Sequence, residues 1–102
     1  MDPKPSSENE TVRAHVWGKG RVQGVGFRAH VEYYAQRIEV TGWVRNVGWD
    51  TVEAVAEGSR DKVEHFIEMM KQGPSASRVD ESTVEWETPT GELLEFGVKR
   101  SA

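Results

Sequence analysis

The chain has 102 residues, a formal net charge of −4 at pH 7, and shares of 36% hydrophobic and 29% charged residues. This length predicts one domain with a modest core, and the acidic balance disfavours non-specific binding to nucleic acid or to an anionic membrane surface. Because the sequence contains no cysteine, disulfides, thiolate nucleophiles and cysteine-ligated metals are excluded, and no apolar run is long enough to span a bilayer.

The first ten residues differ in composition from the rest of the chain. They are polar, contain two prolines and show no hydrophobic periodicity, so we expect a disordered tail over residues 1–10. The tail has no apolar segment of the signal-peptide type, which makes the cytoplasm the expected location. The folded domain is expected over residues 11–102.

Hydrophobic residues recur with a period of two in some stretches and with helical spacing in others, which predicts strands and helices respectively. In chain order the pattern predicts a strand over 12–17, a glycine-rich turn, a helix over 26–38, strands over 42–47 and 51–57, a second helix that ends before Gly73, a strand over 83–87 and a short last strand over 94–98. Ser59 is a suitable N-cap for the second helix, and Gly73 with Pro74 ends it.

The order of elements is therefore β-α-β-β-α-β with one additional short strand. Each predicted helix has one apolar stripe, and each predicted strand has one apolar face. The arrangement that buries all of them is an α+β sandwich of the ferredoxin-like, split βαβ type, with two helices packed on one face of a mostly antiparallel sheet. This fold hosts many functions, so it does not decide the activity.

The segment over residues 18–28 (GKGRVQGVGFR) contains four glycines and three basic residues, between a predicted strand and a predicted helix. Glycines allow backbone N–H groups to converge, and a helix N-terminus adds further free N–H groups with a partial positive charge. Together they predict a nest for a small dianion such as phosphate, within reach of the Arg28 guanidinium. The alternative interpretation is a tight glycine turn with ordinary surface arginines.

A second motif favours the phosphate interpretation. Gly20–Arg28 (GRVQGVGFR) followed by Gly42–Asn46 (GWVRN) closely resembles the acylphosphatase family, and the resemblance continues through residues 52–58 and 73–74 to about residue 92. It implies an acylphosphatase-like domain over residues 11–102. It also implies that the chain hydrolyses acyl phosphates to a carboxylate and inorganic phosphate, without a metal, a cofactor or a covalent phospho-enzyme.

The resemblance also implies roles for individual residues. By matching position, Arg28 is the phosphate-binding arginine and Asn46 is the asparagine that orients the attacking water. The remaining phosphate oxygens are expected to be held by backbone N–H groups of the loop residues Val22, Gln23, Gly24, Val25, Gly26 and Phe27. The expected partners are a small-molecule acyl phosphate and inorganic phosphate, and the small single core predicts a monomer.

Two places differ from the pattern of the family. Gly26 stands where many members have an aromatic residue, although a small residue also occurs in relatives. The predicted hairpin turn over residues 47–51 lacks the common Asp-Gly pair, which places Asp50 where glycine would adopt a positive φ and leaves Trp49 exposed. These departures concern turn geometry and substrate fit.

Other interpretations of the same residues remain open at this point. Asn46 could be only a turn former before the hairpin, and Arg28 only a surface arginine. The fold could serve RNA binding, although Glu53 and Glu57 make the outward face of the third predicted strand acidic. The chain could also bind phosphate or carbamoyl phosphate without hydrolysing it. The histidines have no zinc-ligand spacing, so no metal site is expected.

Overall fold

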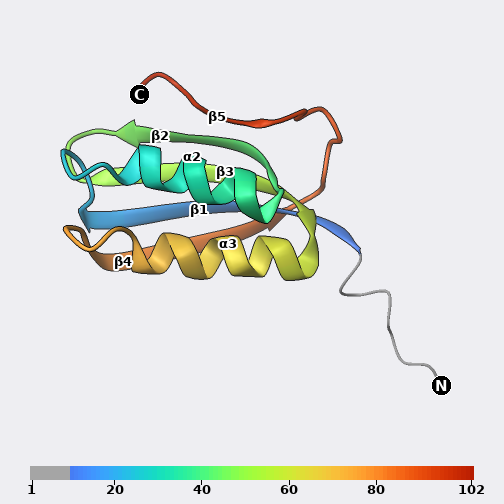
Figure 1. The fold of residues 1–102 in the computed structure, drawn as a ribbon, viewed down its shortest axis with the longest axis horizontal. Coiled ribbons are helices and arrows are strands. Elements are labelled where there is room, and N and C mark those ends of the chain that lie inside the picture. The colour runs from blue at the N-terminus through green and yellow to red at the C-terminus, as the bar shows by residue number, and fades with distance from the viewer. Residues whose placement is uncertain (1–9) are drawn as a thin grey trace.

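The structure is a computed structural model that describes residues 10–102 (Figure 1). The elements are β1 (Thr11–Arg21), α2 (Phe27–Ile38), β2 (Thr41–Val47), β3 (Thr51–Ser59), α3 (Arg60–Gln72), β4 (Arg78–Glu87) and β5 (Phe96–Val98). Most of the predicted tail, residues 1–10, lies outside the described residues. Glu10 is described, and its carbonyl oxygen accepts a 3.0 Å hydrogen bond from the backbone N–H of Arg60.

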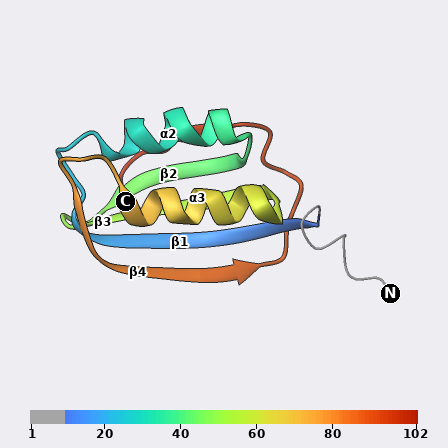
Figure 2. The same ribbon diagram turned by 60° about the horizontal axis from the view of Figure 1, so that its bottom comes forward.

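The strands form one five-stranded sheet in the order β4-β1-β3-β2-β5. Every neighbouring pair is antiparallel except β2 and β5, which run parallel. Both helices lie on the same face of this sheet (Figures 1 and 2). The structure therefore confirms the predicted α+β sandwich of the ferredoxin-like type, with two helices on one face and a short additional strand.

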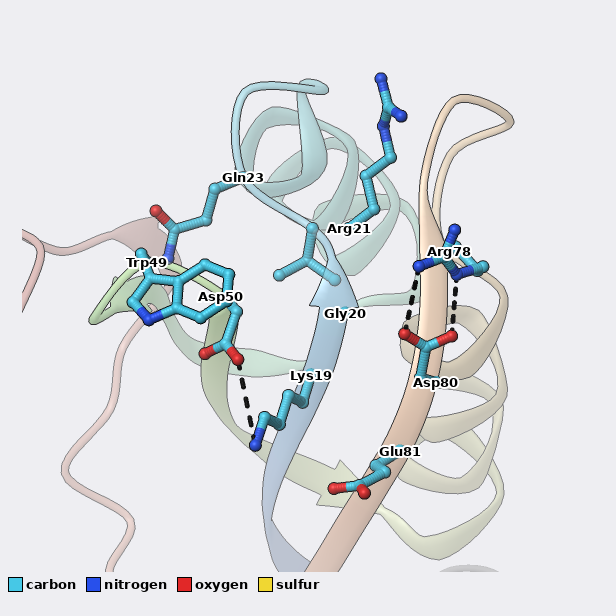
Figure 3. A pocket seen from close by; sticks show the side chains of 10 residues that line it. Lys19, Gly20, Arg21, Gln23, Trp49, Asp50, Arg78, Asp80 and Glu81 are labelled. Atoms are coloured by element: carbon cyan, nitrogen blue, oxygen red, sulfur yellow. Dashed lines mark hydrogen bonds and ion pairs between the residues drawn. The ribbon is translucent and has the colours of Figure 1, made fainter.

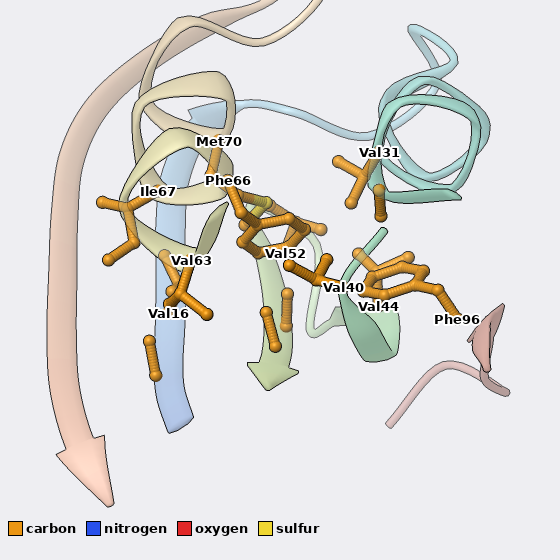
Figure 4. Packing of buried hydrophobic residues seen from close by; sticks show 14 of the residues in the cluster. Val16, Val31, Val40, Val44, Val52, Val63, Phe66, Ile67, Met70 and Phe96 are labelled. Atoms are coloured by element: carbon orange, nitrogen blue, oxygen red, sulfur yellow. The ribbon is translucent and has the colours of Figure 1, made fainter. Parts of the chain in front are cut away.

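The core fills the space between the helices and the sheet (Figure 4). Alternate residues of the central strands point into it, and the apolar stripe of each helix covers them. The buried side chains include Val12, Ala14 and Val16 of β1, Val31 and Ala35 of α2, Val44 of β2, Val52 and Ala54 of β3, and Val63, Phe66 and Met70 of α3. The period-two and helical patterns therefore predicted the buried faces of β1 and α3 correctly. The last strand was predicted too long, because β5 begins at Phe96, and Leu94, which precedes it, is 88% exposed.

The first strand is longer than the sequence predicted. β1 continues past Trp17 to Arg21, because β3 and β4 pair with it on both sides and satisfy its backbone groups. Gly20 permits this close approach, since a Cβ at that position would lie 2.3 Å from the carbonyl oxygen of Arg78. Gly18 and Gly20 thus belong to the strand, and the connecting loop covers residues 22–26 alone.

Two further local predictions need correction. β4 begins at Arg78, well before the predicted start at residue 83, because edge pairing with β1 orders a stretch whose polar side chains show no alternation. The positive φ expected at Asp50 is wrong, because Gly48 adopts it instead with φ 61°. The turn therefore has its positive-φ glycine two residues before Asp50. Trp49 is 82% exposed, as predicted.

The face of the sheet opposite the helices carries a network of ion pairs. Glu57 accepts a 2.7 Å hydrogen bond from Arg13 and further bonds from the backbone N–H groups of Thr90 and Gly91. Glu53 accepts hydrogen bonds from Arg45 at 2.7 Å and lies 2.6 Å from the Nε2 atom of His15. The two carboxylates that the sequence placed on an acidic outward face are therefore buried, with 6% and 4% exposure.

Both buried carboxyl groups titrate below their ordinary range. Burial raises the pKa of Glu57, but the hydrogen bonds from Thr90, Arg13 and Gly91 outweigh it, so the net shift is downward. Burial likewise raises the pKa of Glu53, and the bonds from His15 and Arg45 reverse that shift. A folded-state pKa below the unfolded value means that the charged form stabilises the fold above the unfolded pKa.

We expect the free energy of unfolding to fall as the pH is lowered from about 5 to about 3, because protonation then removes this contribution. The variant Glu57→Gln should show a smaller loss over the same interval, measured as the urea midpoint at a series of pH values. Glu85→Gln is the control, since Glu85 is exposed and has no ion pair within residues 10–102. Equal acid sensitivity of Glu57→Gln and the parent would contradict the assignment.

Candidate active site

The loop over residues 22–26 connects β1 to α2. Gly24 and Gly26 have φ values of 76° and 77°, a conformation that L side chains rarely adopt. Gly26 is the N-cap of α2, which has neither a side-chain cap nor an acidic residue in its first turn. The free N–H groups at this helix start are therefore not occupied by a side chain of the helix, which suits a bound anion.

A hollow of about 370 Å³ lies beside this loop, and we call it the loop hollow. It is lined by Val22, Gln23, Gly24, Gly26, Phe27, Arg28, Ala29, Glu32, Asn46 and Val98. The structure thus brings Arg28 of α2 and Asn46 of β2 together with five of the six predicted loop residues. Val25 is the exception, because it packs against the hydrophobic core.

Gln23 joins the loop to the β2–β3 hairpin. Its Nε2 atom donates to the carbonyl oxygens of Gly48 at 3.1 Å and Thr51 at 3.0 Å, with that of Val47 at 3.4 Å. Because Asn46 directly precedes these residues, the bonds fix the position of the loop relative to Asn46. Gln23 therefore serves the geometry of the loop hollow.

Asn46 is the penultimate residue of β2 and is 9% exposed. Its backbone carbonyl oxygen accepts a 2.9 Å hydrogen bond from the N–H of Ala102, which holds the main chain in place. Its side-chain oxygen is buried and has no hydrogen-bond partner within residues 10–102. Buried polar atoms are nearly always paired in proteins, so this oxygen is an acceptor available to a molecule in the loop hollow.

Arg28 lies in the first turn of α2 and is half-buried. No carboxylate of the described residues lies within 4.0 Å of its guanidinium, so its charge is not neutralised by an ion pair. Glu32 lines the same hollow one helical turn further along. Glu32 was not among the predicted site residues, although its i, i+4 spacing from Arg28 was the available signal.

Comparison with known proteins agrees with this geometry. The acylphosphatase family model matches residues 14–98. An acylphosphatase of Roseiflexus sp. (strain RS-1) is 47% identical over 89 residues, which cover 87% of this chain and 96% of the relative. A solved structure of an acylphosphatase from Coxiella burnetii superposes with a TM-score of 0.83 at 32% identity, covering 97% of this chain and 100% of the other.

The chain belongs to the acylphosphatase family. Its general function is the hydrolysis of acyl phosphates, and it is a hydrolase. A relative from Pyrobaculum islandicum, named acylphosphatase, is 50% identical over 90 residues and covers 87% of this chain and 95% of its own length. The resemblance that rested on the two motifs is therefore confirmed over residues 14–98.

An acylphosphatase acts on a doubly charged phosphoryl group, and the loop hollow has the features for one. It combines a helix start without a side-chain cap, the Arg28 guanidinium and a buried amide oxygen that has no hydrogen-bond partner among residues 10–102. Within the described part of the chain, no three histidine, aspartate or glutamate side chains gather so as to hold a metal ion. No helix of residues 10–102 is long and apolar enough to cross a membrane.

A second hollow of about 540 Å³ adjoins the first, and we call it the hairpin hollow (Figure 3). It is lined by Lys19, Gly20, Arg21, Val22, Gln23, Trp49, Asp50, Arg78, Asp80 and Glu81. Two ion pairs lie along its walls, Arg78 with Asp80 at 2.8 Å and Lys19 with Asp50 at 3.9 Å. Val22 and Gln23 are common to both hollows, so the loop lies between them.

Proposed function

We propose that the loop hollow is the catalytic site. In this proposal Arg28 and the backbone N–H groups of residues 22–27 hold the phosphoryl group, and Asn46 orients the attacking water. The observation that carries the proposal is that Arg28 and Asn46, from different elements, line one hollow in which the buried side-chain oxygen of Asn46 has no partner among the described residues.

The chemistry places modest demands on the protein. The water oxygen forms a bond to phosphorus while the bond between phosphorus and the acyl oxygen breaks, which releases a carboxylate and inorganic phosphate. A carboxylate is a good leaving group, so positioning and charge stabilisation supply most of the catalysis. Arg28 offsets the charge on the phosphoryl oxygens in the transition state. An oxygen of the substrate's own phosphoryl group accepts the proton of the water.

Asn46 suits the water-orienting role because its amide is neutral and can both donate and accept hydrogen bonds. An oriented water close to phosphorus needs an acceptor for one of its hydrogens. The side-chain oxygen of Asn46 provides such an acceptor without breaking a bond within residues 10–102. A carboxylate at this position would repel the phosphoryl oxygens, whereas an amide does not.

We expect the purified protein to hydrolyse benzoyl phosphate in the presence of a metal chelator, followed as the loss of its ultraviolet absorbance. Inorganic phosphate should inhibit competitively, because it occupies the same cradle as the phosphoryl group. If phosphate binds but benzoyl phosphate persists, the chain is a phosphate-binding protein that lacks the reaction. Activity that requires an added divalent metal would contradict the metal-independent mechanism.

We also propose that the protein acts as a monomer in the cytoplasm, on a free acyl phosphate. The core is completed within one chain, and the cysteine-free sequence gains nothing from an oxidising compartment. Light scattering should give the chain mass of 11.5 kDa, and cell fractionation tests the location. The division into a tail over residues 1–10 and a domain over residues 11–102 is likewise a proposal.

A further inference from the structure

The hairpin hollow and the loop hollow lie on either side of the loop residues Val22 and Gln23. Asn46 lines the loop hollow and not the hairpin hollow, whereas Trp49 lines the hairpin hollow and not the loop hollow. In phosphoryl transfer the attacking and leaving oxygens are roughly in line on opposite sides of phosphorus. A phosphoryl group on the loop, attacked from the Asn46 side, therefore directs its acyl group away from Asn46.

The backbone on both sides of Trp49 is fixed to the loop and to β1. The carbonyl oxygen of Gly48 accepts a 3.1 Å hydrogen bond from the Gln23 side chain. The carbonyl oxygen of Asp50 accepts a 2.9 Å hydrogen bond from the N–H of Gly20. The hairpin tip is thus held against the same loop that the phosphoryl group is proposed to occupy, so the backbone that carries Trp49 has a defined position relative to that loop.

The Trp49 side chain is 82% exposed and forms no part of the core, so its ring faces remain available to a ligand. Figure 3 shows it on one wall of the hairpin hollow, across β1 from Arg78 and Asp80. Cationic and anionic side chains are equal in number along these walls, and two of the cations form ion pairs there, Lys19 with Asp50 and Arg78 with Asp80. Such a lining selects a ligand by shape and aromatic contact more than by charge.

We propose that the hairpin hollow is the acyl-group subsite and that Trp49 makes the enzyme favour acyl phosphates with a planar, aromatic acyl group. This inference rests on the proposed catalytic role of the loop hollow. The ring of a benzoyl group packs against the indole, whereas an acetyl group is too small to gain this contact. Trp49 is thus a specificity-determining residue that touches the acyl group.

The test compares kcat/KM for benzoyl phosphate and acetyl phosphate in the parent and in Trp49→Ala. We expect kcat/KM for benzoyl phosphate to fall about tenfold, while that for acetyl phosphate stays within about twofold. Trp49→Phe, which keeps an aromatic face, should recover most of the benzoyl phosphate activity. Inhibition by inorganic phosphate should be unchanged in both variants, because phosphate does not reach the acyl subsite.

Trp86→Ala is the matched control, since Trp86 is an exposed indole near the far end of β4, where Arg60 packs on its ring. It should leave both substrates unaffected. An equal fall for benzoyl and acetyl phosphate in Trp49→Ala would overturn the acyl subsite, because Trp49 would then act through the loop. Parental kcat/KM of Trp49→Ala for both substrates would overturn it too. Failure of the parent to hydrolyse either substrate would instead overturn the proposed catalytic site, and the subsite with it.

Discussion

Replacing Asn46 with alanine is expected to lower kcat about 1,000-fold and to leave the inhibition constant of inorganic phosphate within about twofold of the parent value. Phosphate binding depends on the loop N–H groups and Arg28, and neither is altered by the change. Hydrolysis depends on a water held against phosphorus, and alanine offers that water no hydrogen bond. Steady-state kinetics with benzoyl phosphate give kcat, and inhibition of the same preparation by inorganic phosphate gives the inhibition constant.

The stability of the Asn46→Ala variant separates this role from a structural one. Because the side-chain oxygen has no partner within residues 10–102, its removal breaks no hydrogen bond there and deletes a buried polar atom. The urea midpoint is therefore expected to equal or exceed that of the parent, a result that a turn former would not give. Asn46→Asp is the companion variant, and its charge should weaken phosphate binding. Hydrolysis by Asn46→Ala at the parental rate would rule out water orientation.

The fold could be predicted from the sequence because the periodic hydrophobic patterns that indicate it are local. Val12, Ala14 and Val16 alternate with polar residues, and the buried positions of both helices recur every three or four residues. A pattern of this kind depends on the secondary structure alone, so the buried faces and the layer arrangement follow from it. The two motifs likewise predicted Arg28 and Asn46 as site residues, and the structure places both on one hollow.

Features set by tertiary pairing were not visible in the sequence. β1 extends through Gly18 and Gly20 because strands on both sides supply hydrogen bonds, whereas glycines in isolation predict a turn. Glu53 and Glu57 were predicted on an acidic outward face of the sheet, where charged residues are rarely buried. Both are buried because cations and backbone N–H groups from other elements pair with them. The hairpin hollow depends on the approach of β4, β1 and the hairpin, which no short motif encodes.

Replacing Arg28 with alanine is expected to impair both binding and hydrolysis. Two charge-assisted hydrogen bonds of about 1.5–3 kcal/mol each correspond to a loss in kcat/KM of roughly 100-fold to 10,000-fold. Inorganic phosphate should inhibit at least about tenfold more weakly, because the same fork holds its oxygens. Alanine is a good helix former, and Arg28 has no ion pair within residues 10–102, so the urea midpoint should change little.

Two further variants separate the effect of the planar, bidentate geometry of the Arg28 guanidinium from the effect of its positive charge. Arg28→Lys keeps a cation but not the planar bidentate geometry, so its kcat/KM should lie between those of the parent and Arg28→Ala. Arg37→Ala removes an equal charge from the last turn of the same helix, where the guanidinium lies 5.3 Å from the centroid of the Tyr33 ring, and it should keep parental activity. Full activity of Arg28→Lys would show that positive potential suffices. Comparable losses in Arg37→Ala and Arg28→Ala would show that the net charge of α2, and not contact with the phosphoryl group, governs the rate.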